Sequence, residues 1–104
     1  MIGIDLVSIP EFQRQLNSGG ARFLRKAFSQ SELENQNIQH LAGLWAAKEA
    51  VIKAALVPPR HLSDIEITHD ASGRPRGIVE AQHFEISISH NGDYVVAVAM
   101  RVAA

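Results

Sequence analysis

One stretch of the sequence, residues 40–56, decides the fold: it reads HLAGLWAAKEAVIKAAL. At about 100° of rotation per residue, its large apolar side chains share one broad face of a helix, and the small residues Gly43, Ala47, Ala50 and Ala54 fall on the opposite face. Small side chains let another element approach closely, so we expect this helix to be packed all round. Pro58 and Pro59 end it, because proline cannot donate a backbone hydrogen bond to the helix.

Shorter elements are expected on both sides of this helix. Ser8–Glu11 and Ser29–Glu32 both have the spacing of a capping box, which marks the start of a helix. Gly19-Gly20 is expected to stop the first helix, and Asn91-Gly92 is a strong hairpin signal. In chain order, we predict a strand at 2–7, helical pieces at 8–17 and 21–27, and strands at 65–69, 77–80, 84–90 and 94–102. The last strand is apolar on both faces and is therefore expected to be buried.

The order of these elements predicts an α+β fold, in which a largely antiparallel sheet packs on the long helix. All 104 residues are expected to form a single domain. The composition, 46% hydrophobic and 20% charged, is that of a globular chain and excludes a disordered tail or a coiled coil. Ten basic and eleven acidic side chains give a net charge of −1, so no nucleic-acid partner is expected.

Two further absences in the sequence limit the function. No apolar run is long enough to span a membrane and residues 1–5 do not resemble a signal peptide, so we expect no membrane association. Cysteine is absent, which excludes disulfides, thiolate metal sites and a cysteine nucleophile and fits a cytoplasmic protein.

Four charged residues stand in otherwise apolar sequence: Asp5, Lys48, Glu49 and Lys53. Each has an ordinary explanation. Asp5 can face water at the edge of a strand, Glu49 and Lys53 have the spacing of a helical ion pair, and Lys48 can extend past the helix edge to water. Together they suit a different purpose, because Mg²⁺ takes one or two protein carboxylates plus phosphate oxygens, and lysines bind phosphates. The set predicts metal-assisted chemistry on a phosphorylated substrate.

A second polar group, Ser87, Ser89 and His90, ends a predicted strand just before the Asn91-Gly92 turn. Successive residues of a strand point to opposite faces, so the two serines share a face and His90 points the other way. No Gly-x-Ser-x-Gly elbow is present to support a serine nucleophile. A solvated strand end explains these residues equally well.

Four segments of this chain resemble, in content and in order, those of the 4′-phosphopantetheinyl transferases, and most closely the holo-[acyl-carrier-protein] synthase branch. They are GIDLV (3–7), WAAKEAVIKA (45–54), GRP (73–75) and ISISH (86–90), and they span nearly the whole chain. The Trp-x-x-Lys-Glu-x-x-x-Lys block is highly specific, whereas Ser-His alone is weak. The resemblance implies transfer of 4′-phosphopantetheine from coenzyme A to a serine of an apo acyl carrier protein, with release of adenosine 3′,5′-bisphosphate, as in fatty acid biosynthesis.

The resemblance also implies a role for each matching residue. Asp5 and Glu49 would bind Mg²⁺, and Lys53 would hold the pyrophosphate with Lys48 in support. Asp5, Glu49 and Lys53 would be the catalytic residues, and the base for the serine proton would be either Glu49 or a water on the metal. Ser89 and His90 would line the nucleotide pocket of coenzyme A, with His90 towards the 3′-phosphate. The branch is typically a homotrimer that binds coenzyme A between subunits, which also suits a chain too small to enclose such a cleft.

Three positions depart from the family pattern. Val7 stands where the larger, pseudo-dimeric branch has a third acidic ligand, which favours the small trimeric branch. Glu11 replaces an arginine that meets the acidic carrier, so a different carrier or another arginine (Arg14, Arg22 or Arg25) is implied. Residues 56–60 replace a glycine-rich loop and offer Arg60 as a substitute cation for phosphate. These departures motivate an alternative, a catalytically impaired module that binds coenzyme A or a carrier protein.

Overall fold

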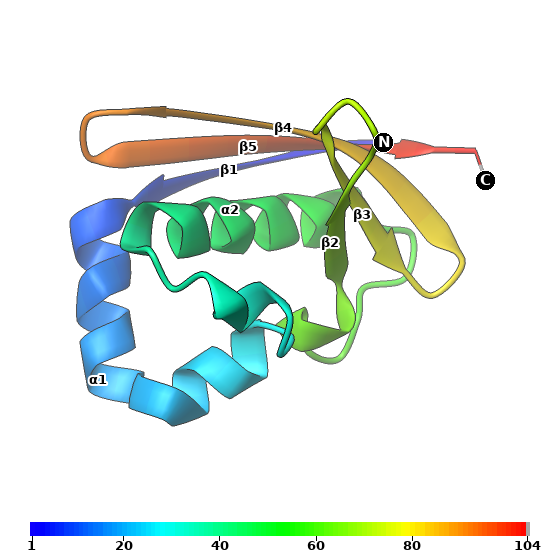
Figure 1. Ribbon diagram of the computed structural model, residues 1–104. Coiled ribbons are helices and arrows are strands. Elements are labelled where there is room, and N and C mark those ends of the chain that lie inside the picture. Colours follow the sequence, from blue (N-terminus) through cyan, green and yellow to red (C-terminus); the bar gives the residue numbers. More distant parts are fainter. Residues whose placement is uncertain (104) are drawn as a thin grey trace.

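Five strands form one antiparallel sheet, and a long helix lies along one face of it (Figure 1). The computed structural model describes residues 1–103. The elements are β1 (Ile2–Ser8), α1 (Ile9–Ala27), η1 (Glu32–Glu34), α2 (Ile38–Ala54), η2 (Leu62–Asp64), β2 (Glu66–His69), β3 (Pro75–Val79), β4 (Gln82–Asn91) and β5 (Tyr94–Val102). The strands are ordered β1-β5-β4-β3-β2. The predicted α+β class, an antiparallel sheet packed on the long helix, is confirmed.

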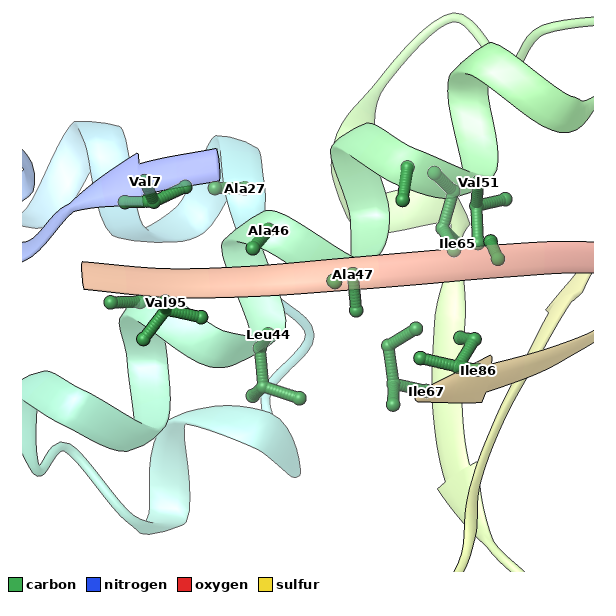
Figure 2. Packing of buried hydrophobic residues seen from close by; sticks show 14 of the residues in the cluster. Val7, Ala27, Leu44, Ala46, Ala47, Val51, Ile65, Ile67, Ile86 and Val95 are labelled. Atoms are coloured by element: carbon green, nitrogen blue, oxygen red, sulfur yellow. The ribbon is translucent and has the colours of Figure 1, made fainter. Parts of the chain in front are cut away.

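The long helix α2 begins and ends two residues earlier than predicted. Asn37 caps it, because its side-chain oxygen accepts hydrogen bonds from the backbone N–H groups of Gln39 and His40 at 3.0 and 3.2 Å. The small residues of α2 are completely buried against the sheet, as predicted (Figure 2). The approach is so close that a Cβ on Gly3 of β1 would collide with the carbonyl oxygen of Ala50. This contact brings side chains of α2 next to those of β1, the strand at one edge of the sheet.

The first helix contains both predicted helical pieces, joined across a kink. Gly20 adopts φ 57° and ψ −145°, a conformation that glycine reaches readily, so the chain turns there and continues as helix (Figure 1). Ser8 caps the start of α1 as predicted, accepting a hydrogen bond from the N–H of Glu11 at 3.3 Å. The second capping box also forms, with hydrogen bonds between Ser29 and Glu32 in both directions, but the helix that follows it has only three residues.

The two faces of the sheet differ in how they are covered. Val95, Ala97 and Ala99 of β5 are buried on the side that carries α2. On the other side no helix of residues 1–103 lies against the sheet (Figure 1), and Ile4 and Leu6 are 57% and 65% exposed. We call this surface the outer sheet face; it comprises Ile2, Ile4, Leu6, Tyr94, Val96, Val98 and Met100. The prediction that strand 94–102 is buried on both faces is therefore wrong for the single chain, because both long helices lie on the same side of the sheet.

Within residues 1–103, neither long helix is apolar over a length that would cross a bilayer.

Candidate active site

Asp5 and Glu49 line one hollow of about 240 Å³. Asp5 comes from β1, where it shares a face with Gly3 and Val7 and therefore points towards α2. Glu49 comes from the side of α2 that faces β1. The side chain of Asp5 is only 17% exposed, so the explanation that it faces water at a strand edge is wrong. The fold thus brings together two carboxylates that are far apart in the sequence.

The two carboxylates are close enough to influence one another. Burial raises the pKa of Glu49 above its usual value, and the negative charge of Asp5 raises it further, whereas the positive charge of Lys53 opposes the shift. A carboxylate with a raised pKa carries its charge at a cost in free energy. A cation bound between Asp5 and Glu49 would remove that cost, so this hollow favours a positive ligand.

Lys53 reaches from α2 to β1. Its Nζ atom donates hydrogen bonds to the carbonyl oxygen of Ile4 at 2.8 Å and to Oδ1 of Asp5 at 3.2 Å. Among residues 1–103, Lys53 therefore forms its ion pair with Asp5. It does not form the helical ion pair with Glu49 that its spacing suggested. Lys53 remains 52% exposed, so an anion entering from solvent can reach its ammonium group.

The donor set of this hollow fits a magnesium ion. Glu11 also lines the hollow, but within residues 1–103 no three histidine or acidic side chains lie close enough together to hold one metal ion, so Asp5 and Glu49 are the pair that matches the sequence prediction. Two are enough, because Mg²⁺ keeps several waters and takes substrate phosphate oxygens as further ligands. Val7, two residues after Asp5, also lines the hollow, so this position supplies an apolar side chain there and no third acidic ligand.

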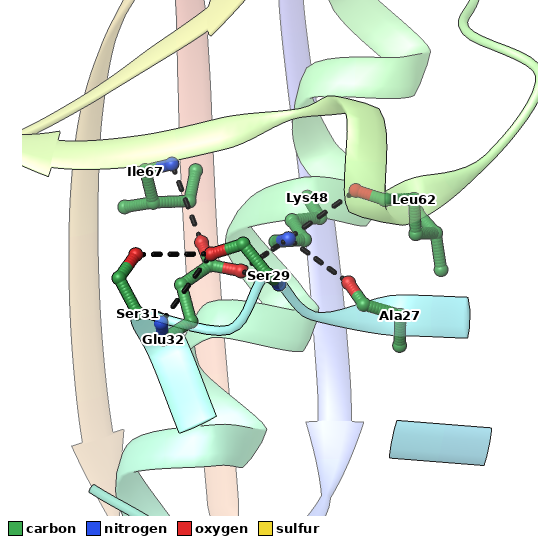
Figure 3. Close-up of polar contacts among 7 residues, drawn as sticks. All are labelled: Ala27, Ser29, Ser31, Glu32, Lys48, Leu62 and Ile67. Carbon is green, nitrogen blue, oxygen red and sulfur yellow. Dashed lines mark hydrogen bonds and ion pairs between the residues drawn. The ribbon is translucent and has the colours of Figure 1, made fainter. Parts of the chain in front are cut away.

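Lys48 does not belong to this hollow, and the prediction that it extends to water is wrong. It is completely buried, and burial lowers its pKa although the hydrogen bond and charge of Glu32 oppose the shift. Its role in holding coenzyme A is therefore not supported by its position. Figure 3 shows the contacts of Lys48: its Nζ donates hydrogen bonds to Oε1 of Glu32 at 2.6 Å and to the carbonyl oxygens of Ala27 at 2.9 Å and Leu62 at 3.2 Å. The carboxylate of Glu32 also accepts hydrogen bonds from the backbone N–H groups of Ser29 and Ile67.

Ser89 and His90 lie near the end of β4 and face opposite sides of the sheet. Ser89 is opposite Val96 on the outer sheet face, and His90 is opposite Val95 on the side of α2. The Nδ1 atom of His90 lies 2.8 Å from Nε2 of Gln39, in the first turn of α2. Gln39 precedes Glu49 by ten residues, or about 15 Å along the helix, so one chain does not bring His90 to the two carboxylates. Sequence patterns gave no signal for Gln39.

A second hollow, of about 670 Å³, opens beside the hairpin of β2 and β3 and is lined partly by Arg74 and Arg76. Asp70 holds the turn that presents them: the hydroxyl of Ser72 and the N–H of Arg74 donate to it and lower its pKa to about 2. The sequence explained residues 73–75 as a turn, which is confirmed, but did not predict this cationic hollow. Arg60 lies exposed in the loop between α2 and η2, outside both hollows.

Comparisons with known proteins agree on one family. The pattern of the 4′-phosphopantetheinyl transferase superfamily matches residues 1–99. A holo-[acyl-carrier-protein] synthase of Mycobacterium leprae is 36% identical, over 95% of this chain and 93% of the relative. The structure of the Helicobacter pylori holo-[acyl-carrier-protein] synthase in complex with coenzyme A superposes with a TM-score of 0.87 and 29% identity, covering 98% of this chain and 100% of that one. The Mycobacterium tuberculosis acyl carrier protein synthase superposes with a TM-score of 0.73 and 36% identity, over 99% of this chain and 96% of that one. This chain therefore belongs to the 4′-phosphopantetheinyl transferase superfamily, as an enzyme of the holo-[acyl-carrier-protein] synthase family.

Proposed function

We propose that this enzyme, acting as one domain per copy, transfers 4′-phosphopantetheine from coenzyme A to a serine of an apo acyl carrier protein. The serine oxygen gives up its proton to Glu49 or to a water and forms a bond to the β-phosphorus, and the bond from that phosphorus to the bridging oxygen breaks to release adenosine 3′,5′-bisphosphate. The observation that carries the proposal is the meeting of Asp5 and Glu49, from two elements, at one accessible hollow, with Lys53 hydrogen-bonded to Asp5 beside it. Their charges suit a pyrophosphate and the cation that accompanies it.

Asp5, Glu49 and Lys53 have separate tasks in the proposed reaction. Asp5 and Glu49 would hold Mg²⁺, which when bound neutralises charge on pyrophosphate oxygens. Lys53 is exposed and bound to Asp5, so its ammonium group can transfer its hydrogen bond from Asp5 to a pyrophosphate oxygen. Charge that develops on the leaving phosphate is then met by a cation already in place. The expected result with apo carrier, coenzyme A and Mg²⁺ is a gain of one phosphopantetheine per carrier by mass spectrometry.

Two results would separate this proposal from its alternative. A carrier whose modified serine is replaced by alanine should show no gain in mass under the same conditions. If the chain binds coenzyme A in calorimetry but modifies no apo carrier, the impaired binding module is the better description, and the transferase proposal fails.

We further propose that the working form is a homotrimer with coenzyme A bound between copies. The outer sheet face supports assembly, because its large apolar side chains are exposed in the single chain and contiguous exposed apolar surface marks an interaction site. The nucleotide residues give a second reason. Since Ser89 and His90 face opposite sides of one sheet, a nucleotide that contacts both is most simply placed between two copies. Arg60 would then be available as a phosphate contact from its exposed loop.

Replacement of Ile4 by glutamate should abolish assembly. Ile4 lies on the outer sheet face opposite Val98, and a charge there would have to be buried without a partner when copies associate. Light scattering should report a mass near the 11.4 kDa of one chain, and transfer should fall with it. Gln30→Glu adds the same charge at an exposed position between α1 and η1 and should leave the oligomeric state unchanged. An Ile4→Glu chain that keeps the wild-type mass would contradict this interface.

A further inference from the structure

The hydrogen bond between Gln39 and His90 joins two exposed side chains that are 51 residues apart in the sequence. Its donor and acceptor atoms, Nε2 of Gln39 and Nδ1 of His90, lie 2.8 Å apart. Neither side chain needs a partner to compensate for burial, and holding both in one geometry costs conformational entropy. Gln39 is well placed to hold His90 in one orientation, because its own backbone is held at the start of α2: its N–H donates a hydrogen bond to Oδ1 of Asn37 at 3.0 Å.

The chemistry of the two groups decides where the proton of His90 lies. The amide nitrogen of glutamine only donates hydrogen bonds, so Nδ1 of His90 must accept. A neutral imidazole carries one proton, which then resides on Nε2. Gln39 therefore turns the ring so that Nδ1 faces α2 and leaves an N–H donor at Nε2, away from the glutamine.

We propose that Gln39 is a positioning residue, which fixes His90 with its Nε2–H directed at the 3′-phosphate of coenzyme A. This inference rests on the proposed function, in which His90 lies in the nucleotide pocket. A phosphate oxygen accepts hydrogen bonds and donates none at full ionisation, so it is bound by a ring nitrogen that carries a proton and repelled by a bare one. Without Gln39 the ring is free to rotate and to exchange tautomers, and only part of the population presents the donor.

The experiment compares wild type with Gln39→Ala, with Gln36→Ala as the matched control, because Gln36 is an exposed glutamine in the loop before α2. Calorimetry measures the Kd for coenzyme A and for dephospho-coenzyme A, which lacks the 3′-phosphate. We expect Gln39→Ala to weaken coenzyme A binding by up to about tenfold, less than complete loss of a hydrogen bond to a charged group, because part of the population still presents the Nε2–H donor. The affinity for dephospho-coenzyme A should be unchanged. Gln36→Ala should behave as wild type with both ligands.

Nitrogen-15 NMR of the histidines, assigned with His90→Ala, provides a readout that needs no ligand. Wild type should show the Nε2–H tautomer at His90, and Gln39→Ala should show a mixture of tautomers. A wild-type ring protonated only on Nδ1, or a Gln39→Ala chain that binds coenzyme A as tightly as wild type, would overturn the proposal. Equal weakening towards both ligands would also overturn it, because Gln39 would then act on another part of the ligand.

A failure of the proposed function has a different signature. If His90→Ala leaves the affinity for coenzyme A unchanged, His90 is not in the nucleotide pocket, whatever its tautomer. If wild type binds coenzyme A with the expected preference over the dephospho form but never modifies a carrier, the transfer reaction fails while the role of Gln39 stands.

Discussion

Asp5→Asn and Glu49→Gln should each reduce phosphopantetheine transfer by at least about 10²–10³-fold, the scale of losing one charge-stabilising group at a phosphoryl-type transition state. Each substitution removes one of the two carboxylates proposed to bind Mg²⁺ and leaves a neutral side chain of nearly the same shape. Mg²⁺ should accordingly raise the Tm of wild type, because a ligand that binds the folded state stabilises it, and should have little effect on either variant.

The same two substitutions should change the stability of the metal-free chain in opposite directions. Asp5→Asn removes the ion pair with Lys53, at 3.2 Å, and should lower the free energy of unfolding by up to about 1 kcal/mol. The raised pKa of Glu49 means that the folded chain holds its proton more tightly than the unfolded chain does. Its charged form therefore costs stability at neutral pH, and Glu49→Gln should raise the Tm.

The pH dependence of this gain follows from the same shift. The contribution of Glu49 to the stability of wild type falls as the pH rises from the ordinary carboxyl pKa, about 4.3, to the raised pKa of Glu49, because over this range the folded chain still holds a proton that the unfolded chain has lost. The advantage of Glu49→Gln should therefore vanish below about pH 4, where both side chains are neutral. Thermal unfolding from pH 4 to pH 8 measures it, with Glu34→Gln as the control on an exposed carboxylate of η1. A Glu49→Gln chain that retains wild-type transfer would refute the site.

Lys48→Met should destabilise the fold by about 3–5 kcal/mol, the cost of leaving one member of a buried ion pair without its partner. Lys48 is completely buried and lies 2.6 Å from Glu32, whose carboxylate would remain in the interior with its charge uncompensated. This is a large part of the 5–15 kcal/mol by which domains of this size are stable. Urea unfolding should show a lower midpoint with an unchanged slope.

Combining Lys48→Met with Glu32→Gln should restore part of the lost stability. The glutamine oxygen can still accept a hydrogen bond from the N–H of Ser29, which lies 2.8 Å from Glu32 in wild type, and no buried charge remains. The double variant is the safer one to study if Lys48→Met alone does not accumulate. A single variant within about 1 kcal/mol of wild type would show that the pair does not hold these elements together.

Much of the fold follows from local sequence. The helical pattern over residues 40–56 and the alternation before Asn91-Gly92 predicted α2 and the β4–β5 hairpin to within about two residues, because both signals act between neighbours in the chain. The kink in α1 was harder, since Gly19-Gly20 indicates a break but not that the helix resumes in the same element. The exposure of the outer sheet face was not predicted for another reason. A strand that is apolar on both faces indicates burial, but the pattern does not tell whether this chain or a second copy packs against each face.

The sequence by itself determined the family, and it singled out Asp5, Glu49 and Lys53 as candidates, because these residues stand in short, specific segments. The tertiary structure alone decided which charges meet. It paired Lys48 with Glu32, across 16 residues, in the interior, and paired the exposed Lys53 with Asp5, 48 residues away. Lys48 and Lys53 are five residues apart on one helix, but they have different surroundings because α2 directs Lys48 towards the loops around η1 and η2 and Lys53 towards β1. That rotation is set by the close packing of the alanines of α2 against the sheet, which no local pattern of charges reveals.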